Sequence, residues 1–346
     1  MITETDGGAA RLDAAGWMRK LTPYRQARTG RAIVELLVTA VPFGLAWAAM
    51  AVALHFNQWW LYALLILPAA GLLVRLFMIQ HDCGHGSFFR QDPVNDWTGR
   101  VLGVLTLTAY DHWRRSHAMH HASSGNLDRR GVGDVDTLTV AEYLALPGWR
   151  RFGYRLYRHP AVMFGLGPAY TFVFHNRLPI GLMRKGWIPW VSTMVTNAAI
   201  AALVVGLMWA IGVVPFLLVH LPVVLIAAAI GVWLFYIQHQ FEETHWADKA
   251  DWNLHEAALH GSSHYDLPKV LAWFTANIGI HHVHHLASRI PYYRLPEVLR
   301  DFPEFRDVGR ITLWQSFSCV PLVLWDEAGK RLVSFREIRT RARAAG

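Results

Sequence analysis

The sequence predicts an all-α integral membrane protein in which four transmembrane helices form two hairpins, with a helical cap on the cytosolic side. Three observations lead to this prediction. Hydrophobic residues make up 53% of the 346 residues and charged residues only 17%, whereas soluble domains usually carry about 25% charged residues. Four apolar stretches reach the length of about 20 residues that crosses a bilayer. The lysine and arginine residues gather in the segments on one side of these stretches.

The four predicted spans pair into two hairpins, because the connection inside each pair is very short. Neither connection, residues 55–58 and 211–212, contains lysine or arginine. Positive residues are frequent before the first span, between the hairpins and near the end of the chain. Since positive charge is retained in the cytosol, both termini and the large middle loop are expected there. The predicted spans are residues 32–54, 59–79, 187–210 and 213–237.

The spans divide the chain into three expected regions. These are a cytosolic N-terminal segment at 1–31, a membrane domain with its cytosolic cap at 32–300, and a cytosolic C-terminal tail at 301–346. The apolar runs 101–110 and 161–174 are too short to cross a bilayer. We interpret both runs as interfacial or re-entrant helices.

The charge pattern indicates a lipid environment. The net charge of +8 would also suit a nucleic-acid partner, but the positive residues flank long apolar runs, which favours anionic lipid headgroups. Arg75, near the end of the second span, is expected to extend its side chain to the cytosolic interface. The two cysteines, Cys83 and Cys319, are too few for a disulfide framework.

Histidine residues form the most specific motif of the chain. Eight of the 19 histidines fall into three clusters, within the strings HDCGHGSFF, RRSHAMHH and NIGIHHVHH. Spacings of three and four residues place the rings of each cluster on one face of a helix. Converging neutral imidazoles are metal ligands, so each cluster is a candidate metal-binding element. The clustered residues are His81, His85, His117, His120, His121, His281, His284 and His285.

A ninth histidine joins these clusters through the predicted topology. His81 lies just past the second span and His239 just past the fourth, and both spans return to the cytosolic side. All nine rings can therefore meet at one membrane face. Nine donors exceed the four that zinc usually takes, and they suit two ions with open positions. Imidazole ligation alone is compatible with zinc, copper, iron or nickel.

Several other residues are weaker candidates for the site. His245 and His264 are possible further ligands, while His220, inside the fourth span, is expected to be a neutral ring bonded to the helix backbone. Carboxylates often orient metal-bound imidazoles by accepting their second N–H. The sequence does not rank the nearby carboxylates, which are Asp82, Asp111, Asp134, Asp136, Glu242 and Asp266.

The three strings, in this order and around two transmembrane hairpins, resemble the histidine boxes of membrane-bound fatty acid desaturases. The resemblance covers roughly residues 60–300, and RRSHAMHH, GNLDRRGVGD and NIGIHHVHH are similar to the bacterial acyl-lipid branch near the omega-6 (Delta-12) type. It implies a non-haem di-iron centre in the cap, with the eight clustered histidines and His239 as ligands. The family spacing selects His281 in HHVHH, so His282 is expected to point away from the metals.

The activity implied by this resemblance is O2-dependent desaturation of fatty acyl chains in membrane lipids, with two electrons from a separate donor of the ferredoxin type. The implied location is the bacterial inner membrane, with a cytosolic active site and no nucleic-acid partner. The same ligand set also fits a di-iron hydroxylase or ketolase of alkanes, carotenoids or sphingolipids. A histidine-rich metal transporter is a more remote alternative, because transporters place polar ligands near the bilayer midplane and the predicted spans hold few.

Overall fold

The structure is a computed structural model that describes residues 14–131 and 134–344. Within these residues, four helices are long and apolar enough to cross a membrane, which confirms the predicted number and order of the spans. Residues 1–13 of the predicted N-terminal segment lie outside the described part. The four helices are α2 (Thr29–His55), α3 (Trp59–Gly84), α9 (Ile188–Ile211) and α10 (Val213–His239).

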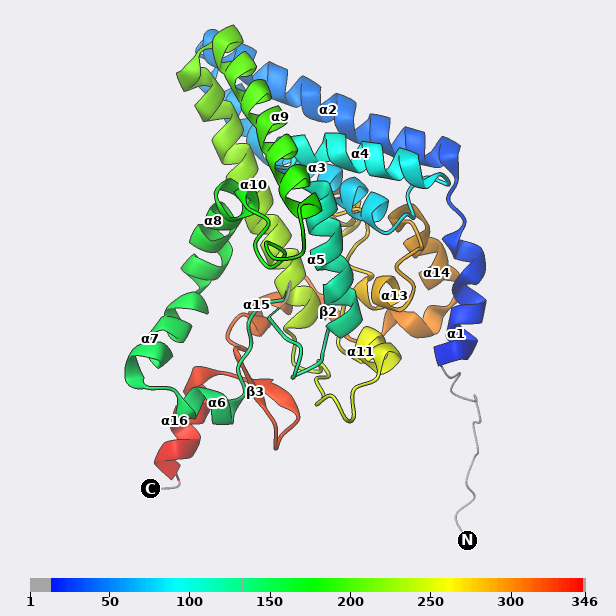
Figure 1. The fold of residues 1–346 in the computed structure, drawn as a ribbon, viewed down its shortest axis with the longest axis vertical. Helices are drawn as coiled ribbons and strands as arrows, with labels where there is room; N and C mark the ends of the chain where they lie inside the picture. Colours follow the sequence, from blue (N-terminus) through cyan, green and yellow to red (C-terminus); the bar gives the residue numbers. More distant parts are fainter. Residues whose placement is uncertain (1–13, 132–133, 345–346) are drawn as a thin grey trace.

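The long helices form the two predicted hairpins, and Figure 1 shows both hairpin tips at the same end of the molecule. The chain reverses between α2 and α3 at Asn57, with φ +56°, and between α9 and α10 at Gly212, with φ +90°. These left-handed conformations suit asparagine and glycine, so each turn needs only a few residues. Helix α10 packs against α3 and α2, and the membrane part is therefore built around α3 and α10.

The segment between the hairpins is helical, but its apolar runs are interrupted. The run 101–110 was expected to be one helix, and this is wrong: α4 ends at Leu105, Leu107 has φ +54°, and α5 begins at Tyr110. Directly after α4, the Thr106 hydroxyl donates a hydrogen bond to the side chain of Gln80 on α3 at 2.5 Å. The run 161–174 forms η2 and α8, and its place relative to the bilayer stays a prediction. The elements are α4 (Asp92–Leu105), α5 (Tyr110–Ser123), α6 (Val140–Ala145), α7 (Gly148–Tyr157), η2 (Val162–Leu166), α8 (Gly167–Val173) and η3 (His175–Arg177).

The chain after α10 returns to the same end of the molecule as α5 and folds into short elements. Strand β1 pairs in parallel with β2, and β3 pairs antiparallel with β4. Each of these strands has three residues, so the helical class holds. The elements are α11 (Leu254–His260), β1 (His264–Asp266), α12 (Lys269–Phe274), α13 (His281–Leu286), η4 (Tyr292–Arg294), α14 (Leu295–Asp301), η5 (Pro303–Arg306), β2 (Arg310–Thr312), α15 (Ser316–Cys319), β3 (Leu324–Asp326), β4 (Arg331–Val333) and α16 (Phe335–Ala344).

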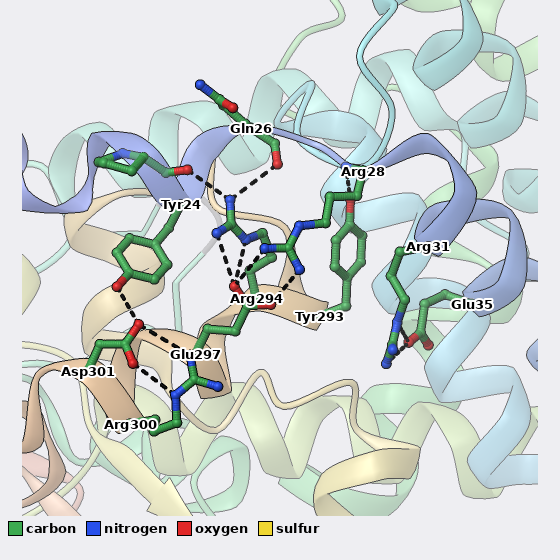
Figure 2. A network of polar contacts seen from close by, with 11 residues as sticks. Tyr24, Gln26, Arg28, Arg31, Glu35, Tyr293, Arg294, Glu297, Arg300 and Asp301 are labelled. Atoms are coloured by element: carbon green, nitrogen blue, oxygen red, sulfur yellow. Dashed lines mark hydrogen bonds and ion pairs between the residues drawn. The ribbon is translucent and has the colours of Figure 1, made fainter.

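A polar network fastens the N-terminal segment, α1 (Ala14–Leu21) and η1 (Thr22–Arg25), to η4 and α14. Figure 2 shows this network. The Tyr24 hydroxyl donates to Asp301 at 2.6 Å, and Arg28 pairs with Glu297 at 2.9 Å. Arg294 donates to the Pro23 carbonyl at 2.8 Å. The start of α2 is thereby held against the segment that follows the third histidine cluster.

Arg75 lies in the interior, and the expectation that its side chain reaches the cytosolic interface is wrong. Only 1% of Arg75 is exposed. Its guanidinium forms an ion pair with Glu35 of α2 and donates to Thr39 at 3.1 Å. It also lies over the Trp273 ring, 4.2 Å from the ring centroid. A carboxylate on the facing helix replaces water as the partner of this buried charge.

Arg158, at the end of α7, connects three separate segments. It is 4% exposed, and its guanidinium donates to the Asp136 carbonyl at 3.2 Å, to Gln240 Oε1 at 3.0 Å and to the Leu322 carbonyl at 3.0 Å. The middle loop, the end of α10 and the C-terminal region are thus joined by one side chain. Each of these acceptors also accepts a hydrogen bond from a neighbouring hydroxyl, so Arg158 contributes the charged donor that all three segments share.

We expect Arg158→Ala to lower the free energy of unfolding by about 3 kcal/mol, because it removes the buried guanidinium and its hydrogen bonds to three segments. Thermal unfolding of the purified protein in detergent measures this loss as a lower midpoint. Arg150→Ala, on the exposed face of the same helix, is the matched control and should change the midpoint little. Equal midpoints for the two variants would contradict the role given to Arg158.

Candidate metal centre

The structure brings the nine predicted histidines together in two groups. In each group the potential donor atoms lie within 4.8 Å of one another, so each group could hold a metal ion. Helix α5 contributes the two histidines at i and i+4 to the first group and the histidine at i+3 to the second. Helix α13 contributes its histidine at i+3 to the first group and its histidines at i and i+4 to the second. One group is His81, His85, His117, His121 and His284, and the other is His120, His239, His281 and His285.

The rings of each group face one another through their Nε2 atoms. In the first group, the Nε2 atoms of His117 and His85 are 3.1 Å apart, and those of His284 and His121 are 3.2 Å apart. In the second, His120 and His239 are separated by 3.2 Å. Ligand nitrogens about 2.1 Å from a shared ion would lie about 3.0–3.4 Å apart at the usual coordination angles. These spacings therefore fit one ion at the centre of each group.

Several of the grouped histidines lie outside the membrane helices. Burial keeps the rings of these histidines neutral, which is the form that binds metals. It lowers the pKa of six grouped histidines well below the usual value, and the neighbouring histidines lower it further. These rings are consequently neutral at pH 7, with a lone pair free for a cation. The six residues are His85, His117, His121, His281, His284 and His285.

An apolar cavity of about 270 Å³ adjoins both groups. Leu73 and Phe77 of α3 and Ala227, Gly231 and Phe235 of α10 are among the residues on its walls. Its walls also include histidines of both groups, which are His81, His117, His120 and His281. An apolar molecule in this cavity would therefore lie beside both candidate metal positions.

Residues 57–317 match the family model for fatty acid desaturases. The chain belongs to the fatty acid desaturase family. It is 43% identical to the fatty acid desaturase of Bacillus subtilis (strain 168), over 93% of this chain and 90% of the relative. It is 27% identical to the sn-1 acyl-lipid omega-3 desaturase (ferredoxin) of Synechocystis, over 79% of this chain and 77% of the relative. It is 23% identical to the sn-1 oleoyl-lipid 12-desaturase of Arthrospira platensis, over 81% of this chain and 77% of the relative.

Two of the six candidate carboxylates reach a candidate ligand of this desaturase. Asp134 accepts a hydrogen bond from His120 Nδ1, and Asp82 Oδ1 lies 3.1 Å from His81 Nδ1. Both contacts leave Nε2 as the nitrogen that faces the group. The other carboxylates bind arginines or are exposed: Asp111 pairs with Arg100, Asp266 pairs with Arg310, and Asp136 and Glu242 are exposed.

The sequence reasoning missed a backbone group at the centre. The Gly261 carbonyl lies 3.2 Å from His239 Nδ1, so it orients this ring as the carboxylates orient His81 and His120. Every residue has a carbonyl, and no sequence signal marks the one that a distant ring will contact.

The remaining histidines of the desaturase lie outside both groups. His282 is fully buried, and its ring is 5.7 Å from that of His264 and 5.8 Å from that of Phe305, outside both groups. Burial lowers the pKa of His282 to about 3. The weaker candidates His245 and His264 also lie outside the two groups.

We expect Asp134→Asn to weaken metal binding about 10- to 100-fold, because His120 loses the carboxylate that fixes its orientation. Metal content after dialysis against a graded series of chelator concentrations measures this change. Asp136→Asn removes an exposed carboxylate two residues away and should leave metal content unchanged. Wild-type metal retention in Asp134→Asn would show that Asp134 does not support the site.

Proposed function

We propose that this desaturase introduces a double bond into fatty acyl chains of membrane lipids, at two iron ions held by its nine grouped histidines. The observation that carries the proposal is the apolar cavity, whose walls include members of both histidine groups. An acyl chain in this cavity has its methylene carbons beside the metals, while its length is held by apolar side chains. The family and its acyl-lipid relatives support the same substrate class.

The proposed ligands are five histidines for one ion and four for the other. They are His81, His85, His117, His121 and His284 for the first, and His120, His239, His281 and His285 for the second. A methylene C–H bond is not acidic, so acid–base catalysis cannot break it, and zinc has no redox chemistry to offer. Two iron ions would supply that redox chemistry. In the overall reaction the acyl chain would give two electrons and two protons, a separate donor would give two electrons, and solvent would give two protons, so that O2 becomes two water molecules.

The protein's own part in this reaction is to position the acyl chain and exclude water. Phe235 lines the cavity beside the second group, with its ring 5.1 Å from His120 and 5.3 Å from His239. Trp113 stacks on His117 at 4.6 Å. These apolar walls keep solvent from the reacting carbons, and the fixed rings let only one stretch of the chain approach the metals.

Three finer features complete the proposal. The double bond is placed at the Delta-12 position, as the name of the Arthrospira relative suggests. The donor is of the ferredoxin type, which the name of the Synechocystis relative supports. The enzyme lies in the bacterial inner membrane with its centre and both termini in the cytosol, since the hairpin tips lack positive charge.

The test is the fatty acid profile of a heterologous host that makes only saturated and monounsaturated lipids. The wild-type chain should add a Delta-12 double bond, and the purified protein should contain about two irons. His120→Ala should abolish the new double bond, whereas His260→Ala, at an exposed position, should retain it. A hydroxyl or keto product, or bound zinc without oxygen consumption, would contradict the proposal.

Gly231 offers a test of the path of the acyl chain. A Cβ at Gly231 would meet nothing within 4 Å, because the residue borders the cavity eight positions before His239, about 12 Å along the helix. We expect Gly231→Leu to fill this space and to reduce desaturation about tenfold or to move the double bond. Mass spectrometry of the products measures both effects.

Gly206→Leu is the matched control, since a Cβ there also meets nothing within 4 Å but the residue lies on α9, away from the cavity. This variant should keep the wild-type profile. If Gly231→Leu gives wild-type products in wild-type amounts, the acyl chain does not run past Gly231.

A further inference from the structure

A buried polar network connects the first hairpin with the segment after the third histidine cluster. Glu35 of α2 and Arg75 of α3 form an ion pair, and both side chains are almost fully buried. The Tyr292 hydroxyl donates to Glu35 Oε2 at 3.2 Å, and Arg75 lies 5.1 Å from the centroid of the Tyr292 ring. Arg31, at the start of α2, binds the other Glu35 oxygen at 2.7 Å. Tyr292 is therefore fixed by a charged pair that lies between two membrane helices.

The same tyrosine is bonded to the metal centre through its backbone. The Tyr292 N–H donates to Asp82 Oδ2 at 2.6 Å, while Asp82 Oδ1 lies 3.1 Å from His81 Nδ1. One oxygen of the buried Asp82 carboxylate thus contacts the Tyr292 N–H, and the other contacts His81. The orientation of the carboxylate therefore depends on the position of Tyr292. A continuous line of contacts runs from Glu35 through Tyr292 and Asp82 to His81.

We propose that Glu35, Arg75 and Tyr292 are positioning residues for the metal centre. By holding Tyr292, the ion pair directs the Asp82 carboxylate to His81 Nδ1, and His81 then presents Nε2 to the first histidine group. This proposal rests on the proposed di-iron function. It explains why a charged pair is kept inside a membrane hairpin, where burying two charges is costly unless their geometry is specific.

Tyr292→Phe is the informative variant, because it removes only the hydroxyl. The ring keeps its stacking on Phe88, with the ring centroids 6.0 Å apart and the ring planes at 27°. The backbone N–H that binds Asp82 is still present. Loss of the bond to Glu35 lets the Tyr292 segment shift, and Asp82 then turns away from His81. Asp82→Asn changes the contact to His81 directly. This variant therefore shows how much the iron release changes when the Asp82–His81 contact is altered.

Tyr293→Phe is the matched control. Its hydroxyl accepts a bond from the Arg28 N–H at 2.9 Å and donates to the Phe88 carbonyl at 3.3 Å, so it is a buried hydroxyl in the adjacent residue without a bond to Asp82 or Glu35. All variants are purified in detergent with iron, and thermal unfolding gives the stability of each. The measurement is the rate at which iron passes to a coloured ferrous chelator, together with the Mössbauer spectrum of the iron-57 form.

Asp82→Asn should release about half of the iron about tenfold faster than the wild type, and Tyr292→Phe should release the same half several-fold faster. The spectrum of one iron should change in both variants, and Tyr293→Phe should match the wild type. Wild-type release and an unchanged spectrum in Tyr292→Phe would overturn the proposal, as would equal effects in Tyr292→Phe and Tyr293→Phe. A wild-type protein that binds no iron would instead refute the proposed function itself.

Discussion

The convergence of nine imidazole rings into two small volumes is the constraint on which the rest of this structure depends. Within each group the facing Nε2 atoms are 3.1–3.2 Å apart, a spacing at which lone pairs repel unless a proton or a cation lies between them. Helices α3 and α10 continue past their apolar parts to bring His81 and His239 to this place. The short helices α5 and α13 supply the other rings, apart from His85, and their opposite division between the groups gives the centre an approximate two-fold character.

Much of the fold and of the candidate site could be predicted, because both depend on periodic patterns. Apolar length indicated the four spans, and the i, i+3, i+4 spacing of the histidines indicated which rings share a helix face. The limits of such patterns are visible at Arg75, whose partner Glu35 lies 40 residues away on another helix. A charge near the end of an apolar stretch suggests a side chain that reaches for water, and only the packing of α2 on α3 provides the alternative partner.

The same reasoning explains why the residues that orient the ligands were not identified from the sequence. Six carboxylates were equivalent in sequence, and tertiary structure separated Asp82 and Asp134 from those that pair with arginines or remain exposed. The Gly261 carbonyl has no sequence signature at all. The cavity follows from packing as well, since α3, α5, α8 and α10 each contribute wall residues. The candidate ligands are thus marked by local strings of the sequence, whereas their orientation and the cavity beside them are properties of the assembled fold.

The division of the nine histidines between the groups has a consequence for how the protein matures. The first group combines the end of the first hairpin with α5 and α13, and the second combines α5, the end of the second hairpin and α13. Because α13 begins at His281, the ribosome must complete more than four-fifths of the 346 residues before either group can close. Metal uptake by the proposed centre would then be a late event in biogenesis, after both hairpins have been inserted, and it would stabilise the finished arrangement of all three histidine strings together.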